Sequence, residues 1–386
     1  MRGSWQSVAL KAVAEIERDA VAATAIDSGT SYVGLENIQS GGSFVDVREV
    51  QRGELASNKF SFSPRHLLYG KLRPYLAKVA RPSFAGICST DILPVLPGAK
   101  LDRDYLAHFL LKPDIVALAS SLATGANLPR LSPRALAEIK VPLPPLSEQR
   151  RIAAILDKAH ALRAKRRAAL ASLDTLTQAI FLDMFGSVAA NPMGWDRSTV
   201  GSAADQVTDG EHLTPRRSGS GIKLLSARNI RDGYLDFSNV DYVDQQEFER
   251  IGRRCAPVRG DVLISCSGSI GRVTSVDVDE PLALVRSAAL VRPMPSLLNH
   301  KFLECYLQEP TMKARMIARA NASSQANLFQ GQIRELPVIL PPLPLQQLFA
   351  RRVAAVEKVK VSYRASLAEL DALFASLQHR AFRGEL

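Results

Sequence analysis

A short stretch of the first half combines cations with an aromatic ring in a pattern that suits nucleic acid. The segment reads GKLRPY and carries Lys71, Arg73 and Tyr75, and Lys78 follows closely. Arginine reads guanine edges through paired hydrogen bonds, and lysine often holds phosphates. The chemistry that these residue types predict is DNA binding.

The second half carries a comparable group, in and around the Gly/Ser-rich loop HLTPRRSGSG. Asparagine reads adenine edges in the way that arginine reads guanine, and serine holds phosphates. A solvated loop explains any one of these residues equally well, but basic loops at matching places in two halves favour a DNA-binding face. The predicted residues here are Arg216, Arg217, Arg228, Asn229, Ser267, Ser269 and Arg272.

Catalytic and metal-binding motifs are missing from the sequence. It contains no P-loop, no G-x-S-x-G and no H-E-x-x-H, and its four cysteines form no C-x-x-C pair. Asn191-Pro192 lacks a following aromatic residue and is interpreted as a linker turn. We therefore predict no catalytic residue, no metal site and no bound cofactor. The scattered cysteines are interpreted as reduced thiols of a cytoplasmic protein.

The composition agrees with a polyanion-binding protein. The 386 residues include 49 Lys and Arg against 38 Asp and Glu, a formal net charge of +11. A basic balance of this size suits nucleic acid. No run of 18 apolar residues occurs, so no membrane span is expected.

One long helix is predicted over residues 147–184. Pro142, Pro144 and Pro145 prevent an earlier start, Ser147 is a good N-cap, and no Gly or Pro follows until Gly186. An apolar seam with alternating steps of three and four predicts a partner helix. The seam consists of Ile152, Ile155, Ala159, Leu162, Ala169, Leu173, Leu176 and Ile180.

The partner helix is predicted from an internal repeat. LPPLPLQ at 340–346 repeats LPPLSEQ at 143–149, and the offset of 197 residues continues downstream, for example from Phe185 to Phe382. The second helix then covers residues 344–381. An antiparallel pair would relate the two halves by a pseudo-two-fold axis.

Shorter elements also repeat. We expect helices over 10–25, 104–118 and 301–317, and strand–turn segments at 32–38 and 224–230. Strand–turn–strand segments are predicted at 65–79 and 259–273. The loops at 125–128 and 325–328 share Ala-Asn-Leu, which we take to align the two halves.

The predicted architecture is mixed α/β (α+β), with two globular domains joined by two long antiparallel helices that form a coiled-coil spacer. The predicted boundaries are 1–142 for the first domain, 143–186 for the central helix, 187–193 for a linker, 194–339 for the second domain and 340–386 for the C-terminal helix.

These motifs together resemble the specificity subunits of type I restriction-modification systems. The resemblance spans nearly the whole chain and is carried by LPPLSEQRRI with its long helix, LPPLPLQ, LYGKLRPY, GICSTD and GDVLISCSGSIGRV. It implies a non-catalytic subunit in which each half reads one part of a bipartite double-stranded DNA target. The helices would fix the gap between the two parts.

The resemblance also implies partners. Two modification subunits would dock on the spacer and methylate adenine with S-adenosylmethionine, and restriction subunits would cleave DNA with ATP and Mg. The second copy departs from the first, because Pro344-Leu345 and Gln347-Leu348 replace Ser147-Glu148 and Arg150-Arg151. The candidate docking and spacer residues are Glu148, Gln149, Arg150, Arg151, Ile152, Ile155 and Gln346.

Two alternatives stay open at this point. One is a helical scaffold or a DNA-binding protein unconnected with restriction. The other is a nuclease or methyltransferase fused to recognition domains and carrying an unrecognised site. The basic face of the long helix is explained equally by solvation and by docking of an acidic partner or of the DNA backbone.

Overall fold

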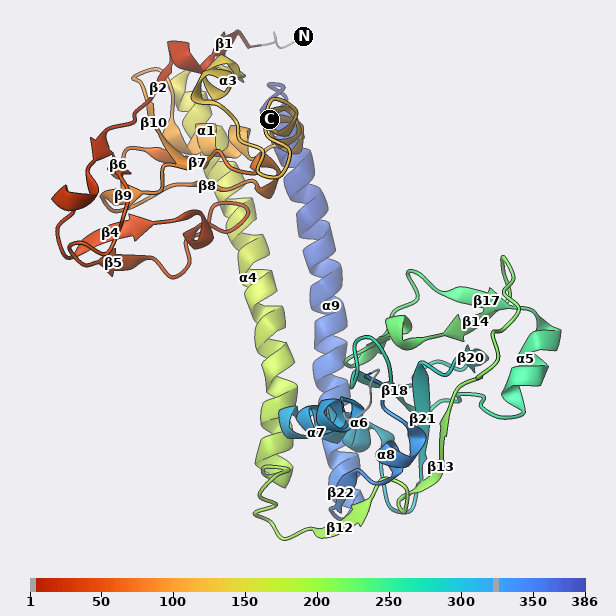
Figure 1. Ribbon diagram of the computed structural model, residues 1–386. Helices are drawn as coiled ribbons and strands as arrows, with labels where there is room; N and C mark the ends of the chain where they lie inside the picture. Colours follow the sequence, from red (N-terminus) through yellow and green to blue (C-terminus); the bar gives the residue numbers. More distant parts are fainter. Residues whose placement is uncertain (1–4, 322–325) are drawn as a thin grey trace. The chain divides into compact units, whose positions relative to one another are not determined.

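The computed structural model describes residues 5–321 and 326–386, so Gln325 of the second predicted loop lies outside the described residues. The chain divides into two compact units. Unit 1 comprises residues 1–167 and 365–386, and unit 2 comprises residues 168–364. Each unit contains one globular part and a portion of both long helices (Figure 1).

The globular part of unit 1 is built on two sheets. A four-stranded sheet has the order β2-β10-β7-β8, and a five-stranded sheet has the order β3-β6-β9-β4-β5. Strands β1 and β11 pair separately and bring residues 7–9 beside the approach to α4. The strands are β1 Ser7–Ala9, β2 Ala14–Ile16, β3 Ala20–Val21, β4 Thr30–Val33, β5 Arg48–Val50, β6 Lys59–Phe62, β7 Leu67–Gly70, β8 Val79–Ala80, β9 Gly86–Cys88, β10 Ile92–Pro97 and β11 Lys140–Pro142. The helices are η1 Leu10–Ala12, η2 Ala23–Ala25, η3 Leu35–Asn37, η4 Pro74–Leu76, α1 Arg103–Leu110, α2 Pro113–Ser121 and α3 Pro133–Glu138.

Unit 2 repeats this plan. Its four-stranded sheet, β13-β21-β18-β19, corresponds to β2-β10-β7-β8, and the parallel pair β14–β20 corresponds to β4–β9. The strands are β12 Asp196–Thr199, β13 Ala204–Asp209, β14 Ile222–Leu225, β15 Ile230–Arg231, β16 Tyr234–Leu235, β17 Asp241–Val243, β18 Val262–Ser265, β19 Val273–Ser275, β20 Leu282–Leu284, β21 Ala288–Pro293 and β22 Pro337–Leu340. The helices are η5 Ala227–Asn229, α5 Gln245–Gly252, α6 His300–Gln308, α7 Pro310–Ala320 and α8 Gln330–Arg334.

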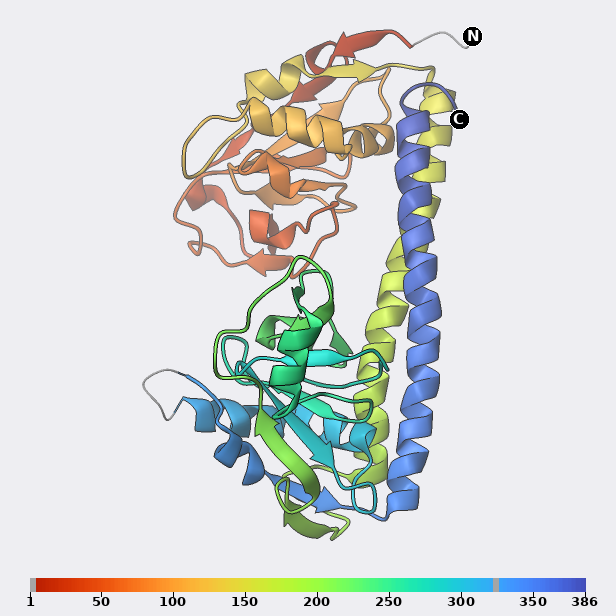
Figure 2. The same ribbon diagram turned by 90° about the vertical axis from the view of Figure 1, so that its right-hand side faces the viewer.

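The two long helices, α4 (Leu146–Phe185) and α9 (Leu343–Ala381), pair in an antiparallel manner within each unit (Figures 1 and 2). In unit 1 the Arg163 guanidinium donates to the Asp371 carboxylate, and in unit 2 the Lys360 ammonium lies 3.0 Å from the Asp174 carboxylate. The two ion pairs are equivalent under the repeat: Lys360 corresponds to Arg163 and Asp371 to Asp174, so the cation lies on α4 in unit 1 and on α9 in unit 2. The predicted helix pair and mixed fold are confirmed.

The ends of the long helices are buried by the globular parts. Ile152 and Leu156 of α4 belong to the core of unit 1, with Phe382 beyond the end of α9. Phe181 and Phe185 of α4 are buried in the core of unit 2, and the Phe185 ring lies 4.8 Å from that of Phe302. Large apolar residues at these ends therefore anchor each globular part on the helix pair.

The predicted apolar seam is only partly buried. Leu162 and Leu176 are 52% and 42% exposed, whereas Ile152 is fully buried. Burial along α4 comes mainly from the globular parts rather than from a continuous coiled-coil contact. Among the described residues, α4 is also the helix whose length and composition would suffice to cross a membrane. The buried contacts of Phe181 and Phe185 give this apolar segment a packing role.

Some local predictions are wrong. Residues 10–25 form short 3₁₀ turns and strands instead of a helix, because β2 pairs with the edge of β10. The helices predicted over 104–118 and 301–317 are each two helices, interrupted at Pro113 and Pro310. Proline fits the first turn of a new helix but removes an interior hydrogen bond.

The predicted N-cap at Ser147 is also wrong. Helix α4 already includes Leu146, and the backbone N–H groups of Glu148 and Gln149 both donate to the Pro145 carbonyl, at 2.9 and 3.0 Å. Ser147 therefore lies inside the first turn.

The alignment through Ala-Asn-Leu is displaced by three residues. The N–H of Leu131 donates to the Lys71 carbonyl, and the N–H of Leu328 donates to the Cys266 carbonyl, both at 2.9 Å. Leu131 and Leu328 are buried, whereas Leu128 is 45% exposed. Leu328 therefore corresponds to Leu131, and the offset of 197 residues already holds here.

Candidate nucleic-acid interface

The loop between β7 and β8, residues 71–78, is held in an unusual conformation. The Gly70 N–H donates to the Lys78 carbonyl at 2.8 Å and closes the loop. Arg73 and Ala77 have φ angles of 52° and 48°, in the left-handed region that costs non-glycine residues energy. Between them the η4 turn exposes Tyr75 by 56%. Strain is thus retained where the loop presents an aromatic ring to solvent.

Unit 2 has the same loop between β18 and β19, residues 266–272. The Ser265 N–H donates to the Arg272 carbonyl at 2.9 Å, as Gly70 does to Lys78. Gly268 and Gly271 have φ angles of 67° and 79° at the two places where unit 1 has Arg73 and Ala77. The closing hydrogen bond and the two left-handed positions therefore recur in both units, although the loop of unit 2 is one residue shorter and lacks the η4 turn, and unit 1 adopts these conformations without glycine.

In unit 1 the loop lies beside a further cation, Arg130, which was not among the residues predicted from the sequence. Arg130 forms two hydrogen bonds with Asp91, at 3.0 and 3.3 Å, and the Lys71 ammonium lies 3.8 Å from the same carboxylate. The Arg73 N–H donates to the carbonyl of Pro129, the residue before Arg130, and this hydrogen bond places Arg130 next to the loop 71–78. In the sequence, Arg130 comes directly after Pro129 and the Ala-Asn-Leu segment. Its place next to this repeated segment was the sequence feature that could have identified it.

Lys78 makes a contact inside the unit. Its ammonium donates to the Leu35 carbonyl at 2.6 Å and so ties the loop to the η3 turn. Arg73 and Tyr75 are the most exposed of the predicted residues in this loop.

In unit 2 two predicted arginines meet at one acidic residue. Arg217 lies 3.0 Å from the Asp241 carboxylate and Arg228 lies 2.8 Å from it, and both guanidinium groups stay largely exposed. A carboxylate that holds two exposed arginines fixes their orientation. Asp241 thus corresponds in role to Asp91 of unit 1.

Arg216 is positioned by a buried acid. Its backbone N–H and guanidinium donate to Glu247, at 3.1 and 3.3 Å, and the Glu247 side chain is 2% exposed. Hydrogen bonding from Arg250, followed by the contacts from Arg216, outweighs burial and lowers the pKa of Glu247 to about 2. Glu247 is therefore a charged anchor for the base of this loop.

Asn229 is not part of a surface, which corrects the predicted site. It is 1% exposed, its side-chain oxygen accepts from the Ser226 N–H at 3.0 Å, and its amide donates to the Asp236 and Asn239 carbonyls at 3.0 and 3.1 Å. The equivalent Asn37 of unit 1 is likewise buried, and its side chain holds the η3 turn. An amide whose donors and acceptor are used internally cannot read a base edge.

Ser267, Ser269 and Arg272 lie on the loop 266–272, where Ser267 and Arg272 are half-buried and Ser269 is exposed. Ser287 joins this loop to η5. Its carbonyl accepts from the Cys266 N–H at 2.8 Å, and its hydroxyl accepts from the Ala227 N–H at 3.0 Å. The structure thus brings this loop close to the turn that carries Arg228.

The candidate docking residues at the start of the long helices fall into two groups. Gln149, Ile152 and Gln346 are fully buried and belong to the interior of their units. Arg150 is 71% exposed, Arg151 pairs with Glu148 at 2.7 Å on the surface, and Ile155 is half-buried. The buried residues are therefore corrected to structural positions.

The cysteines offer no reactive thiol. Burial raises the pKa values of the Cys88, Cys255 and Cys266 thiols to about 12. Within residues 5–321 and 326–386, no group of three His, Cys, Asp or Glu side chains is arranged to hold a metal ion.

The fold and these surfaces define a class of protein, namely a duplicated recognition subunit mounted on a pair of long helices. The family model "Type I restriction modification DNA specificity domain" matches residues 3–171 and 226–368. The chain belongs to this family. It is a DNA specificity subunit of a type I restriction-modification system, with two target recognition regions and no catalytic activity of its own.

Matches to named relatives cover much of the chain. It is 22% identical to the specificity subunit of the type I restriction enzyme EcoBI of Escherichia coli, over 99% of this chain and 86% of that protein. It is also 22% identical to the EcoKI specificity subunit of Escherichia coli K12, over 79% of this chain and 69% of that protein.

Solved structures share the fold. The S subunit of a type I restriction-modification system from M. genitalium has a TM-score of 0.63 at 13% identity, covering 99% of this chain and 96% of that one. A chain from a study of complex assembly and conformational transition of the type I R-M system has a TM-score of 0.61 at 20% identity, covering 100% and 99%.

Proposed function

We propose that each globular part reads one part of a bipartite double-stranded DNA target, and that the paired helices set the gap between the two parts. The observation that carries this proposal is the repeated loop after β7 and β18, which lies at the same end of the same sheet in both units. In unit 1 it carries Arg73 and Tyr75. In unit 2 it lies near Arg228 and carries Arg272.

The reading surface proposed for unit 1 is centred on Lys71, Arg73, Tyr75 and Arg130. That of unit 2 is centred on Arg216, Arg217, Arg228, Ser267, Ser269 and Arg272. Arginines held by acidic residues support this role, because an oriented guanidinium loses less entropy when it binds a base edge or a phosphate.

We propose that two modification subunits dock on the helix pair and that restriction subunits join them. Glu148, Arg150, Arg151 and Ile155 are the residues near the start of α4 that we retain for docking. S-adenosylmethionine, ATP and Mg would bind to those partners, and this chain would bind no cofactor. The domain boundaries predicted from the sequence, including the linker 187–193, remain part of this proposal.

A hybrid protein tests the modular organisation. Residues 1–142 are replaced by the matching part of a relative with another target, and methylated sites are mapped in a host that lacks the native gene. One half of the target should change while the other half and the gap stay the same. Changes in both halves would refute the proposal.

A second variant tests the spacer. An insertion of one helical turn after Ala168, with a matching turn in the facing segment of α9, should widen the gap without altering either half-site. An unchanged gap in a folded, active complex would contradict the proposed ruler. Duplex binding by the wild-type chain, measured with and without modification subunits, separates DNA recognition from a purely protein-binding scaffold.

A further inference from the structure

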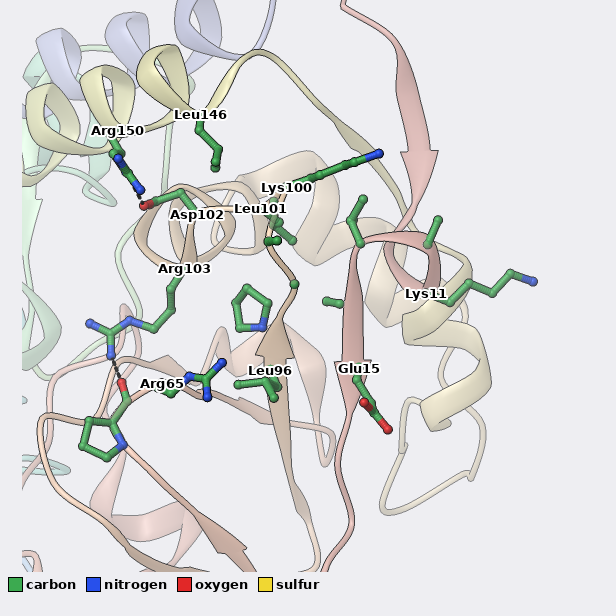
Figure 3. Close-up of a pocket in the computed structure, with 17 residues that line it drawn as sticks. Lys11, Glu15, Arg65, Leu96, Lys100, Leu101, Asp102, Arg103, Leu146 and Arg150 are labelled. Carbon is green, nitrogen blue, oxygen red and sulfur yellow. Dashed lines mark hydrogen bonds and ion pairs between the residues drawn. The ribbon is translucent and has the colours of Figure 1, made fainter.

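A hollow of about 880 Å³ opens in unit 1 beside the first turns of α4. Figure 3 shows the residues that line it, which come from the segment around β2, the loop between β6 and β7 that carries Arg65, the end of β10, the approach to α1 and the start of α4. Five of the lining residues are lysine or arginine and two are acidic. The hollow is therefore basic.

Two of these cations are engaged by the unit itself. The Lys11 ammonium pairs with Glu138 at 2.7 Å, and its side chain extends away from the other cations in Figure 3. The Arg103 guanidinium donates to the backbone carbonyls of Pro64 and Pro82. These two residues are positioned by the fold.

Three cations remain for a ligand. Arg65 and Lys100 are exposed, and neither forms an ion pair within the described part of the chain. Arg150 is 71% exposed and lies 3.8 Å from Asp102, whose carboxylate already caps α1 through the N–H groups of Asp104 and Tyr105. The positive charge of these side chains is thus poorly neutralised.

The hollow lies away from the proposed DNA-reading loop. Strand β10 has Ile92 opposite Gly70, where the loop 71–78 begins, and it ends at Pro97, which lines the hollow. The two features therefore occupy opposite ends of one sheet. A protein ligand fits this position better than a second stretch of the same DNA surface.

The same hollow recurs in unit 2 with a different charge. There Leu343 and Gln347 occupy the positions of Leu146 and Arg150, and the volume is about 380 Å³. Its charged lining consists of two arginines and two aspartates, and Arg292 forms two hydrogen bonds of 2.7 Å with Asp261. The repeat thus retains the hollow but makes it basic in unit 1 and balanced in unit 2.

We propose that the hollow of unit 1 binds an acidic polypeptide segment of a partner protein, whose Asp and Glu carboxylates pair with Arg65, Lys100 and Arg150. Charge-assisted hydrogen bonds from guanidinium to carboxylate are strong and directional. The inference rests on the proposed function, in which partner subunits dock near the start of the long helices. Because the hollow of unit 2 lacks this charge, a partner could distinguish the first half from the second.

The test uses the full-length chain and a fluorescein-labelled eight-residue peptide of alternating Glu and Gly. Fluorescence anisotropy at low salt measures binding to the wild type, to the triple variant Arg65→Ser, Lys100→Ser, Arg150→Ser, and to a control. The control, Arg52→Ser, Arg134→Ser, Lys140→Ser, removes the same charge from exposed positions of unit 1 outside the hollow. Among the described residues, Arg150 is the one of these six cations that lies in an ion pair, and all six side chains are exposed, so thermal unfolding of both variants should match the wild type.

The hollow variant should bind the peptide about tenfold more weakly than the wild type, and the control should bind as the wild type does. Equal weakening of both variants would show non-specific attraction and overturn the proposal, as would the absence of wild-type binding. If the hollow variant instead lost affinity for a labelled 30-base-pair duplex, the surface would belong to DNA and the inference would fail. If the wild-type complex binds DNA sequence-specifically but does not bind the peptide, this inference alone is overturned. If the wild-type complex does not bind DNA sequence-specifically, the proposed function is refuted.

Discussion

Gln149 and Gln346 lie 197 residues apart and make the same three hydrogen bonds. The side-chain oxygen of Gln149 accepts from the Asp102 N–H at 2.7 Å, and that of Gln346 accepts from the Asn299 N–H at 2.8 Å. Each amide donates to two backbone carbonyls, with distances of 2.8 to 3.0 Å. The backbone partners of the two glutamines are also 197 residues apart, so the same set of hydrogen bonds attaches each long helix to its globular part.

Replacing either glutamine should destabilise its unit. Gln149→Leu and Gln346→Leu each leave three backbone groups without their side-chain partner, and we expect a loss of about 2 kcal/mol in the free energy of unfolding. Urea denaturation followed by circular dichroism measures it. The exposed neighbour Gln347→Leu serves as the matched control and should change stability by less than about 0.5 kcal/mol. Equal effects of Gln346→Leu and Gln347→Leu would contradict this role.

The contact between α1 and α4 should make unit 1 sensitive to acid. Asp157 of α4 accepts hydrogen bonds from His108 at 2.9 Å and from Arg81 at 2.8 and 3.1 Å. Partial burial acts to raise the pKa of Asp157, but the hydrogen bonds from His108 and Arg81 outweigh it and hold the pKa well below the usual range. A depressed pKa in the folded state stabilises the protein above the unfolded-state value, and this contribution is lost as pH falls through the folded-state pKa.

The corresponding measurement is stability as a function of pH. The free energy of unfolding of the wild type should fall as pH decreases from about 4.5 to 3, and Asp157→Asn should lose part of this dependence. At pH 7 the substitution should cost about 1 kcal/mol, a value reduced by solvent screening because Asp157 is 37% exposed. Asp183→Asn, on an exposed site of the same helix, is the control. A pH profile of Asp157→Asn that superimposes on the wild type would disprove the linkage.

Strain in the β7–β8 loop should oppose stability while supporting DNA binding. Arg73→Gly removes a left-handed non-glycine residue and should stabilise unit 1 by about 1 kcal/mol, while weakening duplex binding through loss of a cation. Ala77→Gly relieves the same kind of strain without a change in charge, so it should stabilise the unit and leave DNA affinity near the wild-type value. The two variants are compared by urea denaturation and by anisotropy with a labelled target duplex. Equal DNA affinity for both would remove Arg73 from the interface.

The arginines held by Asp241 should contact DNA. Arg217→Ala and Arg228→Ala should each weaken duplex binding by about tenfold at low salt and reduce the slope of log K against log salt by about 1 if the lost contact is to a phosphate. The control is Arg259→Ala, because Arg259 is also an exposed arginine paired with an aspartate, Asp279, but lines the hollow at the other end of the sheet. Equal losses in all three variants would indicate general electrostatics rather than this surface.

Several features of this protein were determined by local pattern. The proline-bounded start of each long helix and the strand–turn–strand segments follow from residue types at short range, and the offset of 197 residues follows from comparing two such local patterns; together they led to the correct fold and family. Such patterns are readable from the sequence because backbone preference and the alternation of apolar and polar residues are set within a few residues.

The tertiary structure decided which side chains reach solvent. Asn229 has a side chain of the type that reads bases but is buried in its turn. Gln149 is a polar helix residue of the type usually found on the surface but is fully buried. Arg130 joins Lys71 at Asp91 although 59 residues separate them in the sequence. Burial and ion pairing depend on contacts between distant segments, so no spacing along the chain could assign these roles.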